Sequence, residues 1–340
     1  MRVEIERIAR FAGMRILVIG DIMLDEFIWG KVSRISPEAP VPVVDVNGET
    51  YYPGGAANVA RNLRELGAET LLLGLAGADP QGDRLCSLLE DAGIRTAGVV
   101  RDPNRPTTVK TRIIARNQQV VRVDRERIAP IDAAQRERMI AFVCETMQHA
   151  DGIVVADYGK GALDQPLADH ISRVARDRGK VLAVDPHPHT PLVWKGATAI
   201  KPNRIEAFHA AGMRLTPPVD PATQDQPLLL AARALQQSWK PESLLVTLGE
   251  QGMLLFQGDA APYHIPTRAK EVFDVSGAGD TAIAVLTLGL IAGAPPREAA
   301  ELANCASGIA VSKLGTATVT AAELVAQASN LPCPDSSAHS

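Results

Sequence analysis

The sequence has few cysteines, few aromatic side chains and no apolar stretch long enough to cross a bilayer. Only four of its 340 residues are cysteine and none forms a Cys-x-x-Cys pair, so neither a zinc site nor a disulfide framework is predicted. This usage fits a reducing cytoplasm, which is the location we expect. The longest apolar run, at residues 282–294, is too short for a membrane span, and the N-terminus lacks the apolar core of a signal peptide.

The charge balance argues against two classes of partner. Lysine and arginine number 35 against 39 acidic residues, giving a net charge of −4, so no general attraction to nucleic acid or membranes is expected. A hydrophobic content of 46% suits a globular protein with a sizeable core. We expect one domain over residues 1–330 and a disordered tail over residues 331–340.

Short apolar segments alternate with helical segments along most of the chain. Those at residues 15–21, 70–76, 153–156, 181–184 and 197–200 are continuous enough to be buried on both faces, as in a parallel sheet. This order predicts an α/β fold with a mostly parallel central sheet and helices on both faces. Loops that follow the strands should then meet at one edge, where ligands of such sheets bind.

Further β-like segments predict a small β-lid formed near residues 27–49 and 106–124. Residues 101–127 contain eight basic and three acidic side chains, in a chain whose net charge is negative. Either this charge protects an exposed sheet edge from aggregation, or it binds a phosphate on the substrate. The candidates for phosphate binding are Arg105, Lys110 and Arg112, together with Lys160 between two glycines.

The motif with most chemical content is Asp274-Val275-Ser276-Gly277-Ala278-Gly279-Asp280, followed by an apolar helical run. The backbone N–H groups of Gly277, Ala278 and Gly279, with the positive end of the helix, would form an anion site. Asp280 would repel an anion, but it is placed to take a proton from a nucleophile that attacks one. The alternative is a glycine-rich helix start with an acidic residue in its first turn.

Polar residues near the first strands supply candidate substrate ligands. Asp21 and Asp25 follow the first strand, where they could hold hydroxyl groups of a substrate or cap a turn or helix. Gly54 and Gly55 would let a substrate approach the backbone closely. Asn58, one turn into the next helix, can both donate and accept hydrogen bonds.

Asn203 and Glu206 are three residues apart, so they share one face of a predicted helix. A carboxylate and an amide on one face suit the hydrated Mg²⁺ of a nucleotide. Taken by itself, the same pair is more typical of a variant of the helix-capping box. His187 and His189 are interpreted as loop residues, because no third metal ligand is evident.

Two of these motifs resemble the signatures of the ribokinase-like (PfkB) sugar kinases. Residues 274–280 resemble D-T-x-G-A-G-D, with Val275 in place of Thr and Ser276 where a small residue is usual, and residues 54–58 resemble the second signature. The likeness covers roughly residues 14–320. It implies an ATP-dependent carbohydrate kinase of ribokinase-like fold, with Asp280 as base.

The same resemblance implies where the cofactors ATP and Mg²⁺ bind. Asn203 and Glu206 match the family's Asn-x-x-Glu element, and Glu206 would organise Mg²⁺ through water. The nucleotide would lie near Thr247, Gly249, Gly252 and Asn304.

Within the family, residues 20–25, 33–43 and 157–161 most resemble the kinase domain of heptose-phosphate kinases. That likeness implies phosphorylation of D-glycero-β-D-manno-heptose 7-phosphate at C1, toward ADP-heptose for lipopolysaccharide. It also implies a separate nucleotidyltransferase partner, since no His-x-Gly-His type motif is found. Those kinases tend to have Lys near His187, which leaves the role of this loop open.

Two alternatives remain at this point. One is a related kinase acting on fructose phosphate, ribose or a nucleoside, and the other is a non-catalytic sugar-phosphate sensor. The exposed lid strands further predict a homodimer formed through the lid.

Overall fold

The computed structural model describes residues 3–116, 118–269, 271–313 and 315–329. The tail predicted to be disordered, residues 331–340, lies outside the described residues. Within them, no helix is long and apolar enough to cross a membrane. The three cysteines that are described, Cys86, Cys144 and Cys305, are free.

The central sheet has nine strands in the order β13-β12-β11-β10-β9-β8-β1-β4-β5. Seven of them pair in parallel: β1 (Arg15–Gly20), β4 (Glu69–Gly77), β5 (Arg95–Asp102), β8 (Gly152–Ala156), β9 (Val181–Asp185), β10 (Ala199–Ile200) and β11 (Ser243–Thr247). The last two, β12 (Met253–Phe256) and β13 (Tyr263–Ile265), are antiparallel and close one edge. The predicted mostly parallel sheet is confirmed.

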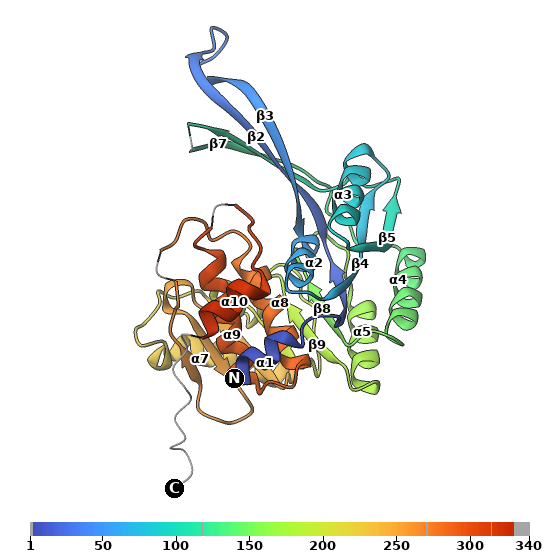
Figure 1. Ribbon diagram of the computed structural model, residues 1–340, viewed down its shortest axis with the longest axis vertical. Helices are drawn as coiled ribbons and strands as arrows, with labels where there is room; N and C mark the ends of the chain where they lie inside the picture. Colours follow the sequence, from blue (N-terminus) through green and yellow to red (C-terminus); the bar gives the residue numbers. More distant parts are fainter. Residues whose placement is uncertain (1–2, 117, 270, 314, 330–340) are drawn as a thin grey trace.

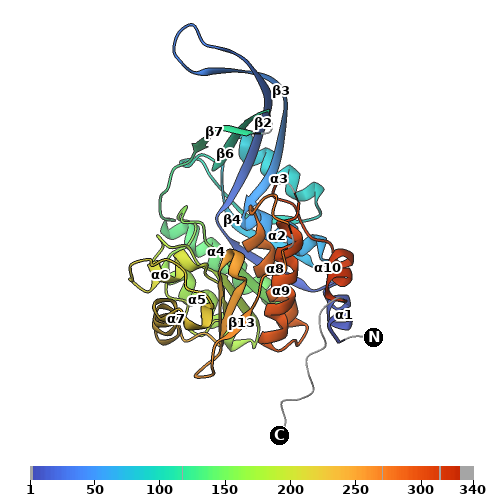
Figure 2. The same cartoon turned by 90° about the vertical axis from the view of Figure 1, so that its left-hand side faces the viewer.

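Helices cover both faces of this sheet, as Figure 2 shows. One face carries α1 (Val3–Ala9), α2 (Ala56–Glu65), α3 (Pro80–Asp91), α8 (Ala278–Ile291), α9 (Pro296–Ala310) and α10 (Ala321–Ala328). The other carries α4 (Ala133–Thr146), α5 (Gln165–Asp177), α6 (Arg204–Ala210) and α7 (Gln226–Trp239). Strand β1 serves both cores, since Ile16 and Val18 point to the first and Leu17 and Ile19 to the second.

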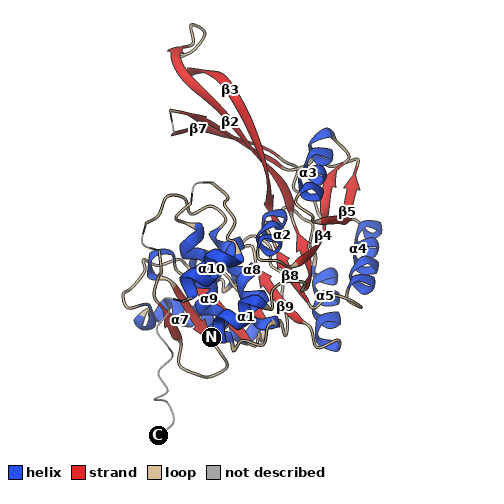
Figure 3. Ribbon diagram, in the orientation of Figure 1, coloured by secondary structure: helices blue, strands red, loops and turns tan. Residues whose placement is uncertain are grey.

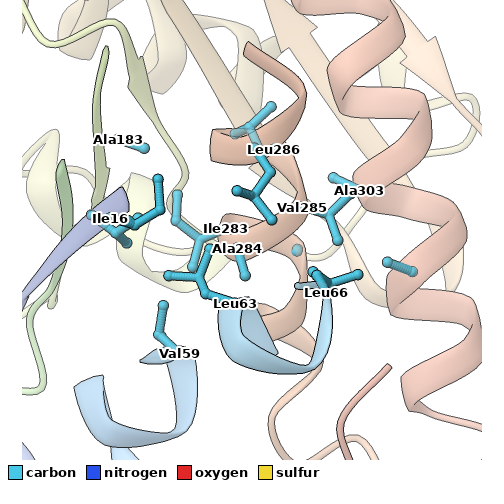
Figure 4. Close-up of a cluster of buried hydrophobic side chains, with 14 of the residues drawn as sticks. Ile16, Val59, Leu63, Leu66, Ala183, Ile283, Ala284, Val285, Leu286 and Ala303 are labelled. Carbon is cyan, nitrogen blue, oxygen red and sulfur yellow. The ribbon is translucent and has the colours of Figure 1, made fainter. Parts of the chain in front are cut away.

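Helix α8 is buried over most of its length, from Asp280 to Gly289. Figure 4 shows Ile283, Val285 and Leu286 packed among side chains of α2, α9 and the central sheet. A helix that is apolar on all sides belongs in a core rather than at a surface. Its N-terminal turn is therefore held in a fixed place relative to the sheet.

The lid is a separate sheet of four strands, in the order β3-β2-β6-β7, that projects from the body (Figure 1). Its strands are β2 (Ile22–Ile35), β3 (Pro42–Gly55), β6 (Val109–Ala115) and β7 (Gln118–Arg125). Figure 3 shows that strands and turns alone make up this projection. These four strands overlap the segments near residues 27–49 and 106–124 that the sequence predicts for the lid.

The first two lid strands are longer than predicted. Strand β2 begins at Ile22, directly after Asp21, and it pairs with β3 as far as Gly55. The helix that carries Asn58 therefore begins at Ala56, because Gly54 and Gly55 still belong to β3. Gly55 makes this change of direction at a φ of 62°, and the N–H of Ala56 donates to the carbonyl of Asp21.

Candidate active site

The anion motif lies at the N-terminus of α8. Gly277 is the residue before the helix and has a φ of 80°, a conformation that favours glycine. A Cβ on Gly277 would also lie only 3.0 Å from the side-chain nitrogen of Asn58. Asp274 fixes the turn, since its carboxylate accepts hydrogen bonds from the N–H groups of Ser276 and Gly315. The sequence before α8 thus builds a turn at the helix N-terminus, in which the N–H of Ala278 donates to the carbonyl of Val275 at 3.3 Å.

Asp280 lies in the first turn of α8 and is 7% exposed. Each of its two carboxylate oxygens accepts a hydrogen bond: Oδ2 from Nδ2 of Asn58, at 2.6 Å, and Oδ1 from the hydroxyl of Tyr158. Burial raises the pKa of Asp280 to about 6, although these two hydrogen bonds act to lower it. A buried carboxylate whose pKa is near neutrality is suited to act as a general base.

A second buried charge pair lies beside the anion motif. Nζ of Lys201 is 3.0 Å from the carboxylate of Asp185, and both side chains are largely buried. A Cβ on Gly279 would lie 3.5 Å from this Nζ. Burial opposes the charge of Lys201, but the carboxylates of Asp185 and Glu206 raise its pKa, so the ammonium is retained. A permanent positive charge therefore lies next to the α8 N-terminus.

Asp21 contacts a loop of the protein itself. Its carboxylate accepts hydrogen bonds from the N–H groups of Tyr158, Lys160 and Ala162, at 2.9–3.0 Å. Both oxygens are thus used to hold the loop that follows β8. The predicted contact of Asp21 with a sugar stays a prediction, and these hydrogen bonds favour the turn-holding alternative.

Asp25 lies at the root of the lid. Its Oδ1 is 2.5 Å from the guanidinium of Arg112 on β6. A Cβ on Gly54 would come within 2.3 Å of the other oxygen, so glycine leaves the room that this carboxylate needs. Asp25, Arg112 and Gly54 are therefore brought together at the root of the lid, and their role as substrate ligands stays a prediction.

The other basic candidates differ in how firmly they are held. Arg105 donates to the carbonyls of Lys160 and Ala129 and lies 3.7 Å from Asp102, contacts that favour a structural role. Lys160 pairs with Glu126 at 2.7 Å.

Lys110 is less firmly held, since its Nζ is 4.0 Å from the nearest carboxylate, that of Asp124. Burial and the charge of Lys160 lower the pKa of Lys110. The two ammonium groups therefore lie close enough to repel each other.

The predicted nucleotide residues line one cavity of about 460 Å³. Thr247, Gly249, Gly252 and Asn304 all belong to it, and so do Ala278 and Gly279 of the anion motif. A largely apolar pocket that ends at backbone N–H groups suits a base attached to phosphates. Sequence reasoning missed its apolar wall, which includes Val272, Val275 and Val311.

Asn203 and Glu206 form a capping box at the start of α6, as the alternative interpretation predicts. The N–H of Glu206 donates to Asn203 Oδ1, and the N–H of Asn203 donates to Glu206 Oε2. Burial, followed by the charge of Asp185, raises the pKa of Glu206 to about 7. Among the described residues, no three His, Cys, Asp or Glu side chains are grouped to hold a metal ion.

His187 and His189 lie in the loop after β9, as expected. The ring of His189 packs edge-to-face on His187 and on His209, with centroids 5.5 and 4.9 Å apart. His187 also lies against Gly159, in the loop held by Asp21.

Three residues of the site were not identified in the sequence: Tyr158, Asp185 and Lys201. Tyr158 stands inside the quoted motif of residues 157–161, and Asp185 and Lys201 each follow a strand of the central sheet. Position after a strand was the available signal, but it gives no indication of which residues pair across the sheet edge.

An anion site at a helix N-terminus, a buried carboxylate beside it, a nucleotide-sized cavity and a β-lid together define a kinase of the ribokinase-like fold. Comparison with known proteins agrees. Residues 14–322 match the model of the pfkB family carbohydrate kinases. The chain belongs to this family and is an ATP-dependent sugar kinase, so the alternative of a non-catalytic sensor is not supported.

Two curated relatives are similar to almost the whole chain. It is 44% identical over 96% of its length to the bifunctional protein HldE of Desulfatibacillum aliphaticivorans, and 41% identical over 94% to that of Paramagnetospirillum magneticum. The chain spans 65% and 64% of these two relatives.

Two solved structures share the fold. Arabidopsis thaliana ribokinase complexed with ribose and ATP has a TM-score of 0.71 and 17% identity, over 93% of this chain and 98% of that one. Escherichia coli phosphofructokinase-2 in complex with substrates and products has a TM-score of 0.73 and 20% identity, over 94% and 99%.

Removing the buried ammonium should be costly. In Lys201→Met, the carboxylate of Asp185 is left buried without its partner, so we expect the free energy of unfolding to fall by about 3–5 kcal/mol. Chemical denaturation of the purified variant measures this. The double variant Asp185→Asn/Lys201→Met is the control and should recover much of the loss, whereas a loss below about 1 kcal/mol in the single variant would contradict the pairing.

Proposed function

We propose that the protein transfers the γ-phosphoryl group of ATP to the C1 hydroxyl of D-glycero-β-D-manno-heptose 7-phosphate, giving the 1,7-bisphosphate. The observation that carries the transfer step is the buried Asp280 beside the N–H groups of the α8 N-terminus. The sugar assignment is supported by the sequence likeness to heptose-phosphate kinases and by the relatives named bifunctional HldE.

Each residue of the site would have its own role in phosphoryl transfer, according to where it lies. Asp280 takes the proton of the attacking hydroxyl, and the N–H groups of Gly277, Ala278 and Gly279 receive the negative charge of the transferred group. Lys201, beside Gly279, adds a fixed positive charge there. The substrate lies between α8 and the lid root, with Asp25, Gly54, Gly55 and Asn58 as its candidate ligands. A closed lid would exclude water, which competes as acceptor.

Magnesium suits the charge of this site. Asp185, Glu206 and Asp280 face a single buried ammonium, Lys201, so acidic groups are in excess where a polyanionic nucleotide must bind. Burial is the main cause of the raised pKa of Glu206, and the charge of Asp185, one of these acidic groups, adds to it. Glu206, with Asn203, would hold the hydrated ion, whose role when bound is to neutralise phosphate charge. The nucleotide itself would occupy the cavity lined by Thr247, Gly249, Gly252 and Asn304.

The product is expected to pass to a nucleotidyltransferase on the way to ADP-heptose. The name of the curated relatives describes them as bifunctional, and this chain spans about two thirds of their length. A nucleotidyltransferase stays the functional partner that the likeness to heptose-phosphate kinases implies.

The lid is also proposed to form a homodimer contact. It exposes large apolar side chains on several strands, including Trp29, Tyr52, Val121 and Val123, which are 37–51% exposed. An exposed sheet with such residues favours pairing with a second copy.

Loss of the base should abolish turnover and spare nucleotide binding. We expect Asp280→Asn to lower kcat by about 10²–10⁴, because a positioned base contributes that much. Steady-state kinetics and ATP binding by calorimetry measure the two effects. A variant with near wild-type turnover would overturn the assignment of Asp280.

Charge at Glu206 should affect magnesium more than folding. Glu206→Gln keeps an acceptor for the capping box but removes the negative charge, so the Mg²⁺ concentration for half-maximal rate should rise. Glu323→Gln, in the capping box of α10, is the matched control and should leave it unchanged. An unaltered Mg²⁺ titration in Glu206→Gln would leave this residue only its capping role.

A phosphate on the substrate should be bound by the lid root. We expect Lys110→Met and Lys160→Met each to raise the KM for heptose 7-phosphate, since a charge-assisted hydrogen bond contributes about 1.5–3 kcal/mol. The KM for ATP should not change. Arg116→Met, which removes a charge at the far end of β6, is the control.

The substrate series decides between sugars. Values of kcat/KM should be highest for heptose 7-phosphate, and lower for unphosphorylated heptose and for fructose 6-phosphate. Equal values for the two heptoses would refute a phosphate pocket. Preference for fructose 6-phosphate would retain the kinase and exclude the heptose assignment.

The dimer has its own test. Val121 and Val123 alternate on one face of β7, so Val121→Lys/Val123→Lys places two charges in the contact. Sedimentation velocity should show a dimer for the wild type and a shift toward monomer in this variant. Leu230→Lys on α7, also at an exposed apolar residue, should remain dimeric. A monomeric wild type would exclude the contact.

A further inference from the structure

Tyr158 touches the proposed base and has no role in the reaction described so far. Its hydroxyl donates a hydrogen bond to Oδ1 of Asp280, while Asn58 donates to Oδ2. The three side chains come from distant parts of the chain, namely the loop after β8, helix α2 and helix α8. Each oxygen of the base therefore has its own donor.

The loop that carries Tyr158 is held at several points. Asp21 accepts from the N–H groups of Tyr158, Lys160 and Ala162, and Asp157 accepts from the N–H of Gly159 at 2.8 Å. The loop passes through Gly161 at a φ of 90°, where a Cβ would lie 2.1 Å from the carbonyl oxygen of Ala129. A hydroxyl presented by such a loop has a fixed position rather than one chosen by the substrate.

We propose that Tyr158 is a positioning residue for phosphoryl transfer: its hydroxyl orients the carboxylate of Asp280 and favours the ionised form of that carboxylate. Asp21 acts one step further away, by fixing the loop that carries Tyr158. This inference rests on the proposed role of Asp280 as base.

The hydrogen bond from Tyr158 should favour the ionised form of the Asp280 carboxylate. A carboxylate that accepts a hydrogen bond is stabilised in its charged form. Burial and the charge of Asp185 raise the pKa of Asp280, whereas Tyr158, Asn58 and Lys201 lower it, and the resulting pKa is about 6. Burial raises the pKa of the Tyr158 hydroxyl well above its ordinary value, and the charges of Asp280, Asp185 and Glu206 raise it further, so this group remains protonated and able to donate.

Removing the Tyr158 hydroxyl should change the pH dependence of the rate in one direction. A base must be ionised to work, so the rate falls as the pH drops through its pKa. Removing the hydroxyl of Tyr158 removes a contribution that lowers this pKa. The acidic limb of the pH–rate profile should therefore move to higher pH, by roughly one unit, which is a tenfold loss of rate below the limb.

The test is the pH profile of kcat/KM for the sugar phosphate in Tyr158→Phe, from pH 5 to pH 9. We expect the acidic limb to rise by about one unit, most of the rate to return at high pH, and ATP affinity to be unchanged. Tyr263→Phe is the matched control, because it removes a Tyr–Glu hydrogen bond of 2.6 Å, to Glu301, on the far antiparallel edge of the sheet. Its limb should not move.

Two further variants protect the test from a folding defect. Fluorotyrosine at position 158 keeps the ring and makes the hydroxyl a stronger donor, so the limb should move to lower pH. Asp21→Asn weakens the support of the loop and should move the limb in the same direction as Tyr158→Phe, with little added effect in the double variant.

These measurements distinguish a failure of the Tyr158 inference from a failure of the assignment of Asp280 as base. If Asp280→Asn is inactive but the limb is unchanged in both Tyr158→Phe and the fluorotyrosine protein, Tyr158 is only a packing residue and the inference is wrong. If Asp280→Asn keeps near wild-type turnover, the base assignment fails and the inference fails with it. Opposite limb shifts in the two Tyr158 proteins would support the inference.

Discussion

The site depends on holding several charges of both signs together away from water. A buried carboxylate is stable only when donors or cations face it. Asp280 has Asn58 and Tyr158 as donors, and Lys201 pairs with Asp185 beside it. Each of these residues comes from a different strand end or helix, so the central sheet must be complete before the charges can be brought together.

The apolar core fixes this arrangement in space. Helix α8 is buried from its first turn onward and packs against α2 and α9, as Figure 4 shows. The N–H groups at its start are thus held by packing and need no ligand to order them. Preorganised donors of this kind stabilise developing charge without a cost of reorientation during the reaction.

Features that depend on a short stretch of sequence could be predicted. Contacts between residues far apart in the sequence could not. The anion turn of residues 274–280, the alternation of strands and helices and the four lid segments follow from local sequence. The contact between Tyr158 and Asp280 joins residues 122 positions apart, and neither residue reveals its partner. Arg105 and Asp21 show the same limit: their charge and place suggested ligands, but backbone groups of distant loops occupy them.

The first lid strand follows directly from the carboxyl end of a central strand. Only Asp21 separates the end of β1 from the start of β2, and β2 carries Asp25 near its root. At about 3.3 Å per residue, its 14 residues form an arm roughly 45 Å long. By geometry alone, a tilt of about 5° at the root would move the tip of such an arm by about 4 Å. An arm of this length would therefore amplify a small change of angle near Asp25 into a larger displacement at the outer end of the sheet.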